Sequence, residues 1–245
     1  MFIKDPKPTK GLCYFGGMMR KVVFMIDGWF MRKQIYKSKM FLYNGGEIRK
    51  YCFKHLKKDD YLYRIFYYDT EPLDKKGHHP ISKTAIDFGS TGVAEAQRKL
   101  LESIKSTPNF ALRLGKTVWK NNEWILSDEK LKALLKKEIT VDGLTDNDLR
   151  PLIQQKAVDI KIGLDITYIA VKKLADLLII ITGDADIVPV LKFARREGMQ
   201  VCLDPLRNPI RPELREHVDF IDSFIAPAKY KNQSAKPKIS SNSHK

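Results

Sequence analysis

Residues 155–203 read QKAVDIKIGLDITYIAVKKLADLLIIITGDADIVPVLKFARREGMQVCL, and this stretch decides the fold class. Its pattern predicts a long helix near 157–174, a strand at 177–182, a helix near 187–197 closed by Gly198, and a strand at 199–203. The first of these strands is apolar throughout, which is typical of a central strand in a parallel sheet covered on both faces. The stretch therefore indicates an α/β fold.

The N-terminal half shows the same alternation. KVVFMI at 21–26 and YLYRIFYYD at 61–69 are strand-like runs that lead into an aspartate. Helical spacing follows Gly28 and returns at 46–57 and 93–105, and strand-like runs return at 110–119 and 123–126. Strands that alternate with helices predict a domain with a mainly parallel sheet.

Composition favours a polyanionic partner. The 245 residues include 44 Lys and Arg against 29 Asp and Glu, a formal net charge of +15. Such a balance suits nucleic acid first and an anionic membrane only second. The three cysteines are widely spaced, so a disulfide framework or zinc site is disfavoured. Because no apolar run approaches the length of a membrane span, we expect a cytoplasmic protein without a membrane partner.

The chain is expected to hold one folded domain between two loose ends. Residues 1–19 lack periodicity and are predicted to form a loose arm, and residues 20–227 form the domain, with a peripheral insertion at 116–150. Residues 228–245 contain five Lys and no acid, so a disordered basic tail is predicted there.

Acidic residues follow two of the predicted strands. Asp27 comes directly after the first strand, and Asp184 and Asp186 follow the strand at 177–182. Ligands of open parallel sheets bind outside the carboxyl ends of the strands, where these acids would lie. Turn formation explains Asp27, and helix capping explains one of the later pair. A second carboxylate beside the first is better explained by a bound cation.

A third acidic position lies on the long helix. On a helical wheel, Asp159 falls on the same stripe as Ile162, Ile166 and Ile169, whereas Asp165 falls at the edge of that stripe. An unpaired charge on a buried stripe is costly, so Asp159 is expected to have a partner. That partner could be a basic side chain or a metal shared with Asp27 and Asp184. Carboxylate oxygens suit Mg²⁺ or Mn²⁺, which can activate a water to attack a phosphate.

Several segments together resemble the NYN domain proteins, the LabA-like (DUF88) group of the PIN-like nuclease superfamily. The segments are KVVFMIDGWFM, YRIFYYDTEPL, LRLG, the whole of 155–203, and RPELREHVDFID. The most specific piece is 155–203, which is similar to the family pattern of K-x-V-D, a further D, and S-G-D-x-D-F-x-P. The resemblance spans about residues 20–225.

The resemblance implies a PIN-like three-layer α/β/α sandwich and a metal-dependent endoribonuclease. It implies that Asp27, Asp159, Asp184 and Asp186 are catalytic and bind Mg²⁺ or Mn²⁺, with Asp165 a weaker ligand. Thr182 stands where the family usually has Ser, and its hydroxyl would orient a carboxylate or water. The chain departs from the family at Phe30, where many members have Asn, and at Ile187, where Phe is usual.

RNA, single-stranded or structured, is the expected partner, and self-association into a homo-oligomer is a further possibility. Candidate RNA contacts are Trp29, Tyr68, Lys156 and Lys161, although aromatic residues on strands more often pack in the core. The alternative function is a weak or inactive NYN module that binds RNA or a protein. Four retained carboxylates favour the nuclease over that alternative.

Overall fold

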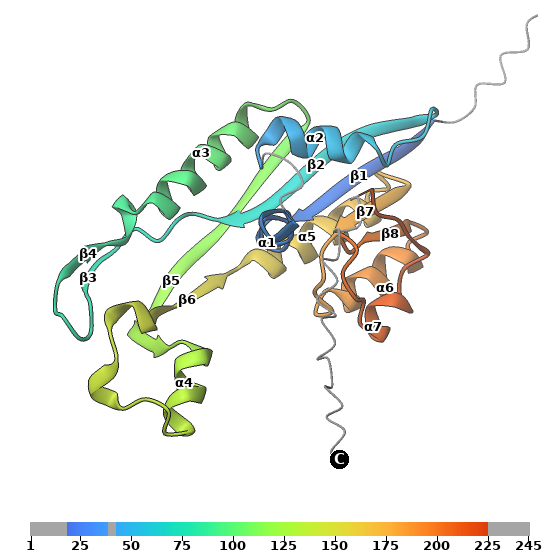
Figure 1. The fold of residues 1–245 in the computed structure, drawn as a ribbon. Coiled ribbons are helices and arrows are strands. Elements are labelled where there is room, and N and C mark those ends of the chain that lie inside the picture. Colours follow the sequence, from blue (N-terminus) through green and yellow to red (C-terminus); the bar gives the residue numbers. More distant parts are fainter. Residues whose placement is uncertain (1–18, 39–42, 225–245) are drawn as a thin grey trace, which may run out of the picture.

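The protein was analysed as a computed structural model, which describes residues 19–38 and 43–224 (Figure 1). A seven-stranded sheet has the order β6-β5-β2-β1-β7-β8-β9, and all neighbours are parallel except β5 and β6. Its strands are β1 (Arg20–Asp27), β2 (Asp60–Thr70), β5 (Phe110–Leu126), β6 (Leu149–Lys156), β7 (Leu177–Ile181), β8 (Gln200–Asp204) and β9 (Phe220–Ile221). The expected mainly parallel sheet is confirmed.

Helices cover both faces of this sheet. One face carries α1 (Gly28–Ser38), α2 (Gly45–Phe53) and α3 (Gly92–Ser106), and the other carries α5 (Val158–Val171) and α6 (Val188–Arg196). The remaining helices are α4 (Asp128–Leu135), α7 (Pro212–Arg215) and three short 3₁₀ turns at Phe88–Ser90, Val141–Gly143 and Asp146–Asp148. The molecule is therefore a three-layer α/β/α sandwich.

The two cores follow from the alternation of side chains along each strand. In β1, Val22, Phe24 and Ile26 point toward α1–α3, whereas Val23 and Met25 point toward α5 and α6. All five side chains are buried. Successive strand side chains point to opposite faces, so a strand covered on both sides must be apolar at every position. This is why the run at 21–26 carries no alternation.

Two features were not expected from the sequence. The sequence gives no strand signal in residues 76–87, yet β3 (Lys76–His78) pairs there with β4 (Ala85–Asp87) as a small hairpin. Residues 149–156 form β6, although LRPLIQQK has no apolar run and includes Pro151. Because β6 lies at the edge of the sheet, it tolerates proline and polar side chains, and its sequence therefore gave no strand signal.

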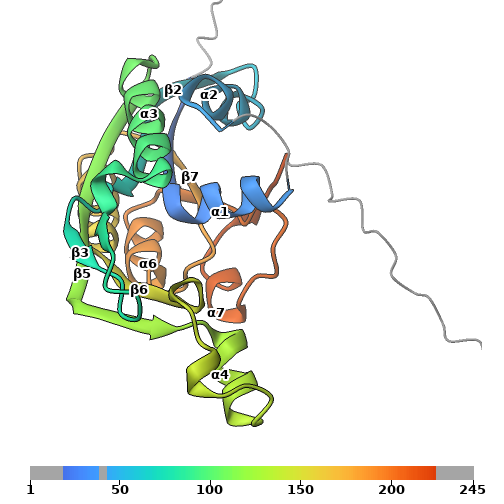
Figure 2. The ribbon, with the colours of Figure 1, turned by 60° about the vertical axis from the view of Figure 1, so that its left-hand side comes forward.

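A lobe projects from the far end of β5 and β6, as Figure 2 shows. Of the predicted insertion at 116–150, residues 127–148 build this lobe around α4, while the flanking residues continue β5 and β6. The predicted arm and tail lie almost entirely outside the described residues. None of the helices in the described part of the chain combines the length and apolar content that crossing a bilayer requires.

Candidate active site

Strand order brings Asp27 beside the segment that follows β7. Ile26 pairs with Ile181 in the parallel ladder between β1 and β7, so the next residues, Asp27 and Thr182, leave the sheet side by side. Asp27 Oδ1 accepts the backbone N–H of Phe30 at 3.0 Å, which caps the first turn of α1. Asp27 therefore has the expected role in the turn, and this role occupies only Oδ1 of its carboxylate.

Thr182 joins two of the acids. Its buried hydroxyl donates to Asp27 Oδ2 at 3.4 Å and accepts the backbone N–H of Asp184 at 3.1 Å. Asp184 Oδ1 in turn accepts the N–H of Asp186 at 3.1 Å. The hydroxyl therefore orients both the Asp27 carboxylate and the turn that carries the later pair.

Asp27, Asp159 and Asp184 line one open pocket of about 500 Å³, here called the acid pocket. Each comes from a different part of the fold: the end of β1, the first turn of α5, and the turn after β7. The other residues around the acid pocket are Trp29, Phe30, Lys33, Gln34, Gln155, Val158, Gly183 and Arg211. The convergence of three acids at one sheet edge agrees with the sequence analysis.

The surroundings of Asp159 differ from the helical-wheel expectation. Ile162, Ile166 and Ile169 do pack on the sheet, but the side chain of Asp159 is exposed. The stripe direction is right, but in the first turn of α5 the acid pocket lies beside Asp159, while its neighbour Val158 is buried in the core. Asp159 therefore meets solvent and other carboxylates, and no basic side chain pairs with it among the described residues.

Burial and mutual repulsion act on these carboxylates. Burial raises the pKa of Asp27 to about 6, more than the Phe30 and Thr182 hydrogen bonds lower it, and Asp159 and Asp184 add to the rise. Burial also raises the pKa of Asp159, with further contributions from Asp184 and Asp186. In the described part of the chain no Lys or Arg forms an ion pair with any of these four acids. A basic protein thus keeps a group of like negative charges.

Asp186 and Asp165 lie differently. Asp186 is exposed and close enough to raise the pKa of Asp159, although it does not line the acid pocket. Asp165 instead accepts the Tyr68 hydroxyl at 2.9 Å and pairs with Arg113 at 3.0 Å. Asp165 does not line the acid pocket and its charge is paired with Arg113, so its part as a weaker ligand stays a prediction that this geometry does not support.

The four candidate RNA contacts separate into two groups. Trp29 is 48% exposed and borders the acid pocket, and Lys156 is exposed at the end of β6. Tyr68 is 0% exposed, so it is not available to stack on a base, and that expectation is corrected. Lys161 is partly buried and donates to the carbonyl oxygen of Leu114.

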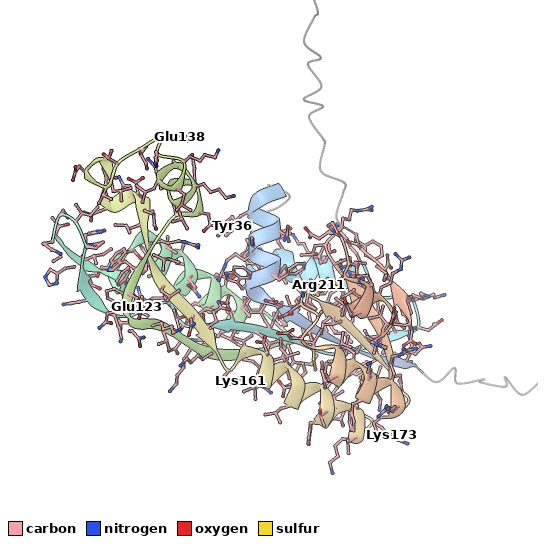
Figure 3. The ribbon with its side chains drawn as sticks, turned by 90° about the horizontal axis from the view of Figure 1, so that it is seen from below. Tyr36, Glu123, Glu138, Lys161, Lys173 and Arg211 are labelled. Atoms are coloured by element: carbon pink, nitrogen blue, oxygen red, sulfur yellow. The ribbon has the colours of Figure 1, made fainter. Side chains whose placement is uncertain are left out.

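Sequence analysis missed the basic and amide groups around the acid pocket. Lys33 and Arg211 are exposed at its rim, and Gln34 and Gln155 also line it. Figure 3 shows α1 between the lobe that carries Glu138 and the segment that carries Arg211. Lys33 lies one helical turn after Trp29, which is a signal that could have been read, whereas Arg211 reaches the pocket only through the fold.

Comparison with protein families decides the class. A model of the NYN domain matches residues 94–223. The chain belongs to the NYN domain family. NYN domains are part of the PIN-like superfamily, with which the three-layer sandwich agrees. The matched residues include Asp159, Asp184 and Asp186, whereas Asp27 precedes them.

Other comparisons add little. No curated protein matches the chain. A solved structure of a protein of unknown function from Vibrio parahaemolyticus is similar, with 12% identity, a TM-score of 0.46, and coverage of 84% of this chain and 93% of that one. Membership of the LabA-like group stays a prediction.

The NYN domain has carboxylates suited to a hard divalent cation, but they are not drawn together around one point. Within residues 19–38 and 43–224, no three His, Cys, Asp or Glu side chains are arranged to hold one ion. Mg²⁺ usually keeps several waters and is held by only one or two carboxylates, so a complete protein cage is not required. The donor chemistry thus fits Mg²⁺ or Mn²⁺ with water as the remaining ligands.

The raised pKa of Asp27 predicts a pH-dependent stability in the absence of metal. Its ordinary pKa is 3.8 and its folded value is about 6, so the folded state holds the proton more tightly. This raised pKa makes the free energy of unfolding fall as pH rises from 4 to 6, by about 2 kcal/mol of a total of about 3 kcal/mol that is reached at higher pH. Urea unfolding in EDTA should therefore show that the free energy of unfolding of Asp27→Asn rises relative to that of the natural protein over that pH range. A difference that stays constant with pH would contradict the prediction.

Proposed function

We propose that this NYN domain is a divalent-metal-dependent endoribonuclease that hydrolyses RNA phosphodiester bonds at the acid pocket. The observation that carries the proposal is the convergence of Asp27, Asp159 and Asp184, with no Lys or Arg paired to them among the described residues, in a protein of net charge +15. NYN domains are generally nucleases and typically act on RNA, which supports the same reading.

The residues divide the work by position. Asp27, Asp159 and Asp184 would hold Mg²⁺ or Mn²⁺, directly or through water molecules, and the bound ion would activate a water and offset the charge developing on the phosphate. Thr182 holds the Asp27 carboxylate and the backbone of Asp184 through its hydroxyl. Asp186 is exposed and would orient the attacking water or hold a second ion.

The rim supplies the positive charge that a phosphate chain needs. Lys33 and Arg211 are exposed at the acid pocket and can pair with phosphates on either side of the scissile bond. The carboxylates alone would repel RNA, and both the basic rim and a bound cation offset that repulsion. Each phosphate contact also makes the affinity fall with salt.

One observation favours the alternative of a binding module without cleavage. The ring of Phe30 packs so closely on Gly183 that a Cβ at Gly183 would lie 2.6 Å from it. Phe30 stands where many NYN domains have Asn, so an apolar ring replaces a polar group beside the acids.

Self-association into a homo-oligomer stays a prediction. The apolar side chains of Ile160, Leu164 and Tyr168 are exposed along α5.

Cleavage of labelled single-stranded and hairpin RNA tests the proposal. The natural protein is assayed with Mn²⁺, Mg²⁺ or EDTA beside Asp184→Asn and the control Asp59→Asn. Asp59 is exposed just before β2, at the N-terminal ends of the parallel strands, whereas the acid pocket lies at their C-terminal ends. Asp59→Asn removes the same charge as Asp184→Asn. We expect metal-dependent cutting that falls by ~100-fold or more in Asp184→Asn and stays unchanged in Asp59→Asn. RNA binding without cutting under any metal would favour the binding module.

A further inference from the structure

A second pocket continues the acid pocket past Trp29. It has a volume of about 370 Å³ and shares Trp29 and Gln155 with the acid pocket. It lies between α1, the start of α3, the small hairpin, and the β5–β6 end of the sheet. A ligand held at the acids can therefore reach this second pocket without leaving the surface.

The walls of the second pocket are mostly apolar, and its one charged group is already paired. The apolar residues are Pro72, Leu73, Ile86, Phe88, Val93, Ala94 and Ile153. Arg32 also lines it, but its guanidinium forms a two-pronged pair with the buried Asp69, at 2.8 and 3.3 Å. A phosphate or other anion would find no unpaired cation among these lining residues. The pocket suits a neutral group.

Two glutamine side chains add hydrogen-bond acceptors. The amide nitrogen of Gln97 donates to the carbonyl oxygen of Thr70 at 2.7 Å, and that of Gln155 donates to the Thr70 hydroxyl at 3.3 Å. Anchoring both nitrogens on Thr70 fixes the two amides, and within the described residues nothing donates to their oxygens. A group with N–H donors would satisfy these oxygens.

Trp29 forms the boundary between the two pockets. Its ring is half-exposed, and the ammonium of Lys33 lies 4.8 Å from the ring centre. An exposed indole offers a flat face for stacking, and the neighbouring ammonium offers a phosphate contact. The combination of a flat face and a cation at one point is suited to a nucleotide.

We propose that the second pocket is a nucleobase subsite, which receives one unpaired base of the RNA whose phosphate lies at the acids. The inference rests on the proposed function for the location of that phosphate. A nucleobase is neutral and planar, and its edge carries N–H donors, which matches the apolar walls, Trp29 and the glutamine oxygens in turn. A base inside a duplex is stacked and paired, so the substrate is single-stranded at this nucleotide.

Binding in EDTA tests the subsite without cleavage. The probes are fluorescein-labelled single-stranded RNA 12-mers, one intact and a set in which a single abasic nucleotide is moved along the chain. Affinity is measured by anisotropy for the natural protein, Trp29→Ala and Trp29→Phe. Removing the stacking face should weaken binding of the intact RNA by about 5- to 150-fold, and Trp29→Phe should retain most of the affinity.

The decisive readout is the coupling between protein and RNA changes. At one abasic position, the affinity of the natural protein should fall by the same factor that Trp29→Ala costs with intact RNA. The affinity of Trp29→Ala should not fall further at that position, because both changes remove the same contact. Losses that simply multiply at every position, or no binding of single-stranded RNA, would overturn the subsite. If coupling is found but no RNA is cleaved in Mn²⁺, the nucleobase subsite is supported and the nuclease function is contradicted. If cleavage depends on Asp184 but no coupling is found, the nuclease function is supported and the subsite is contradicted.

Discussion

Replacing Asp27 with Asn is expected to lower RNA cleavage by ~100-fold or more without lowering the stability of the fold. Asn caps a helix as well as Asp does, so the bond from the Phe30 N–H is kept. The change removes a buried charge that Asp159 and Asp184 repel. Above pH 6 and in EDTA, the free energy of unfolding should therefore stay the same or rise by up to about 3 kcal/mol.

This opposite movement of activity and stability separates a functional carboxylate from a structural one. A carboxylate that only caps α1 would leave cleavage intact in Asp27→Asn. Cleavage and urea unfolding are measured on the same preparations, with Asp59→Asn as the control that should change neither. Full activity in Asp27→Asn, or a clear loss of its stability, would contradict the assignment of Asp27 to the metal site.

Replacing Arg32 with Met is expected to destabilise the fold by about 3–5 kcal/mol. The side chain of Asp69 is fully buried and its charge is held by the two-pronged pair with Arg32. Burial already raises the pKa of Asp69 against the effect of Arg32, so loss of Arg32 leaves an uncompensated charge in the interior. Urea unfolding at pH 7 measures the loss.

A mutant cycle tests the cause. Adding Asp69→Asn to Arg32→Met removes the stranded charge, and Asn can still accept the Thr70 N–H, so the double variant should recover at least about half of the lost stability. Lys33→Met is the control, because Lys33 is the exposed neighbour and should cost less than about 0.5 kcal/mol. Additive losses in the cycle would show that Arg32 acts through packing and not through Asp69.

Helices and strands with a strong local pattern were predictable. The runs at 21–26, 61–69 and 177–182 became β1, β2 and β7, and the periodic segment at 93–105 became α3. These patterns depend on neighbouring residues only, and burial on both faces leaves a continuous apolar run. The polar edge strand β6 and the small hairpin were missed because neither buries a regular apolar face.

The meeting of the acids was also predictable, whereas the surroundings of each acid were not. Parallel neighbouring strands end at the same edge, which is enough to place Asp27 beside the turn of Asp184. The wheel gave the correct stripe for α5 but could not tell that the acid pocket opens beside Asp159 in the first turn, next to the buried Val158. Asp159 is exposed for that reason.

The sequence by itself determined the α/β class, the strands that carry the acids and the edge at which they gather, because periodicity and strand direction are local properties. Tertiary structure alone decided which charges are paired. Arg113 neutralises Asp165 across 52 residues and Arg32 neutralises Asp69 across 37, whereas Asp27, Asp159 and Asp184 are left together. Such pairing depends on which distant segments pack against each other, and packing also brings Lys33, Gln155 and Arg211 to the acid pocket.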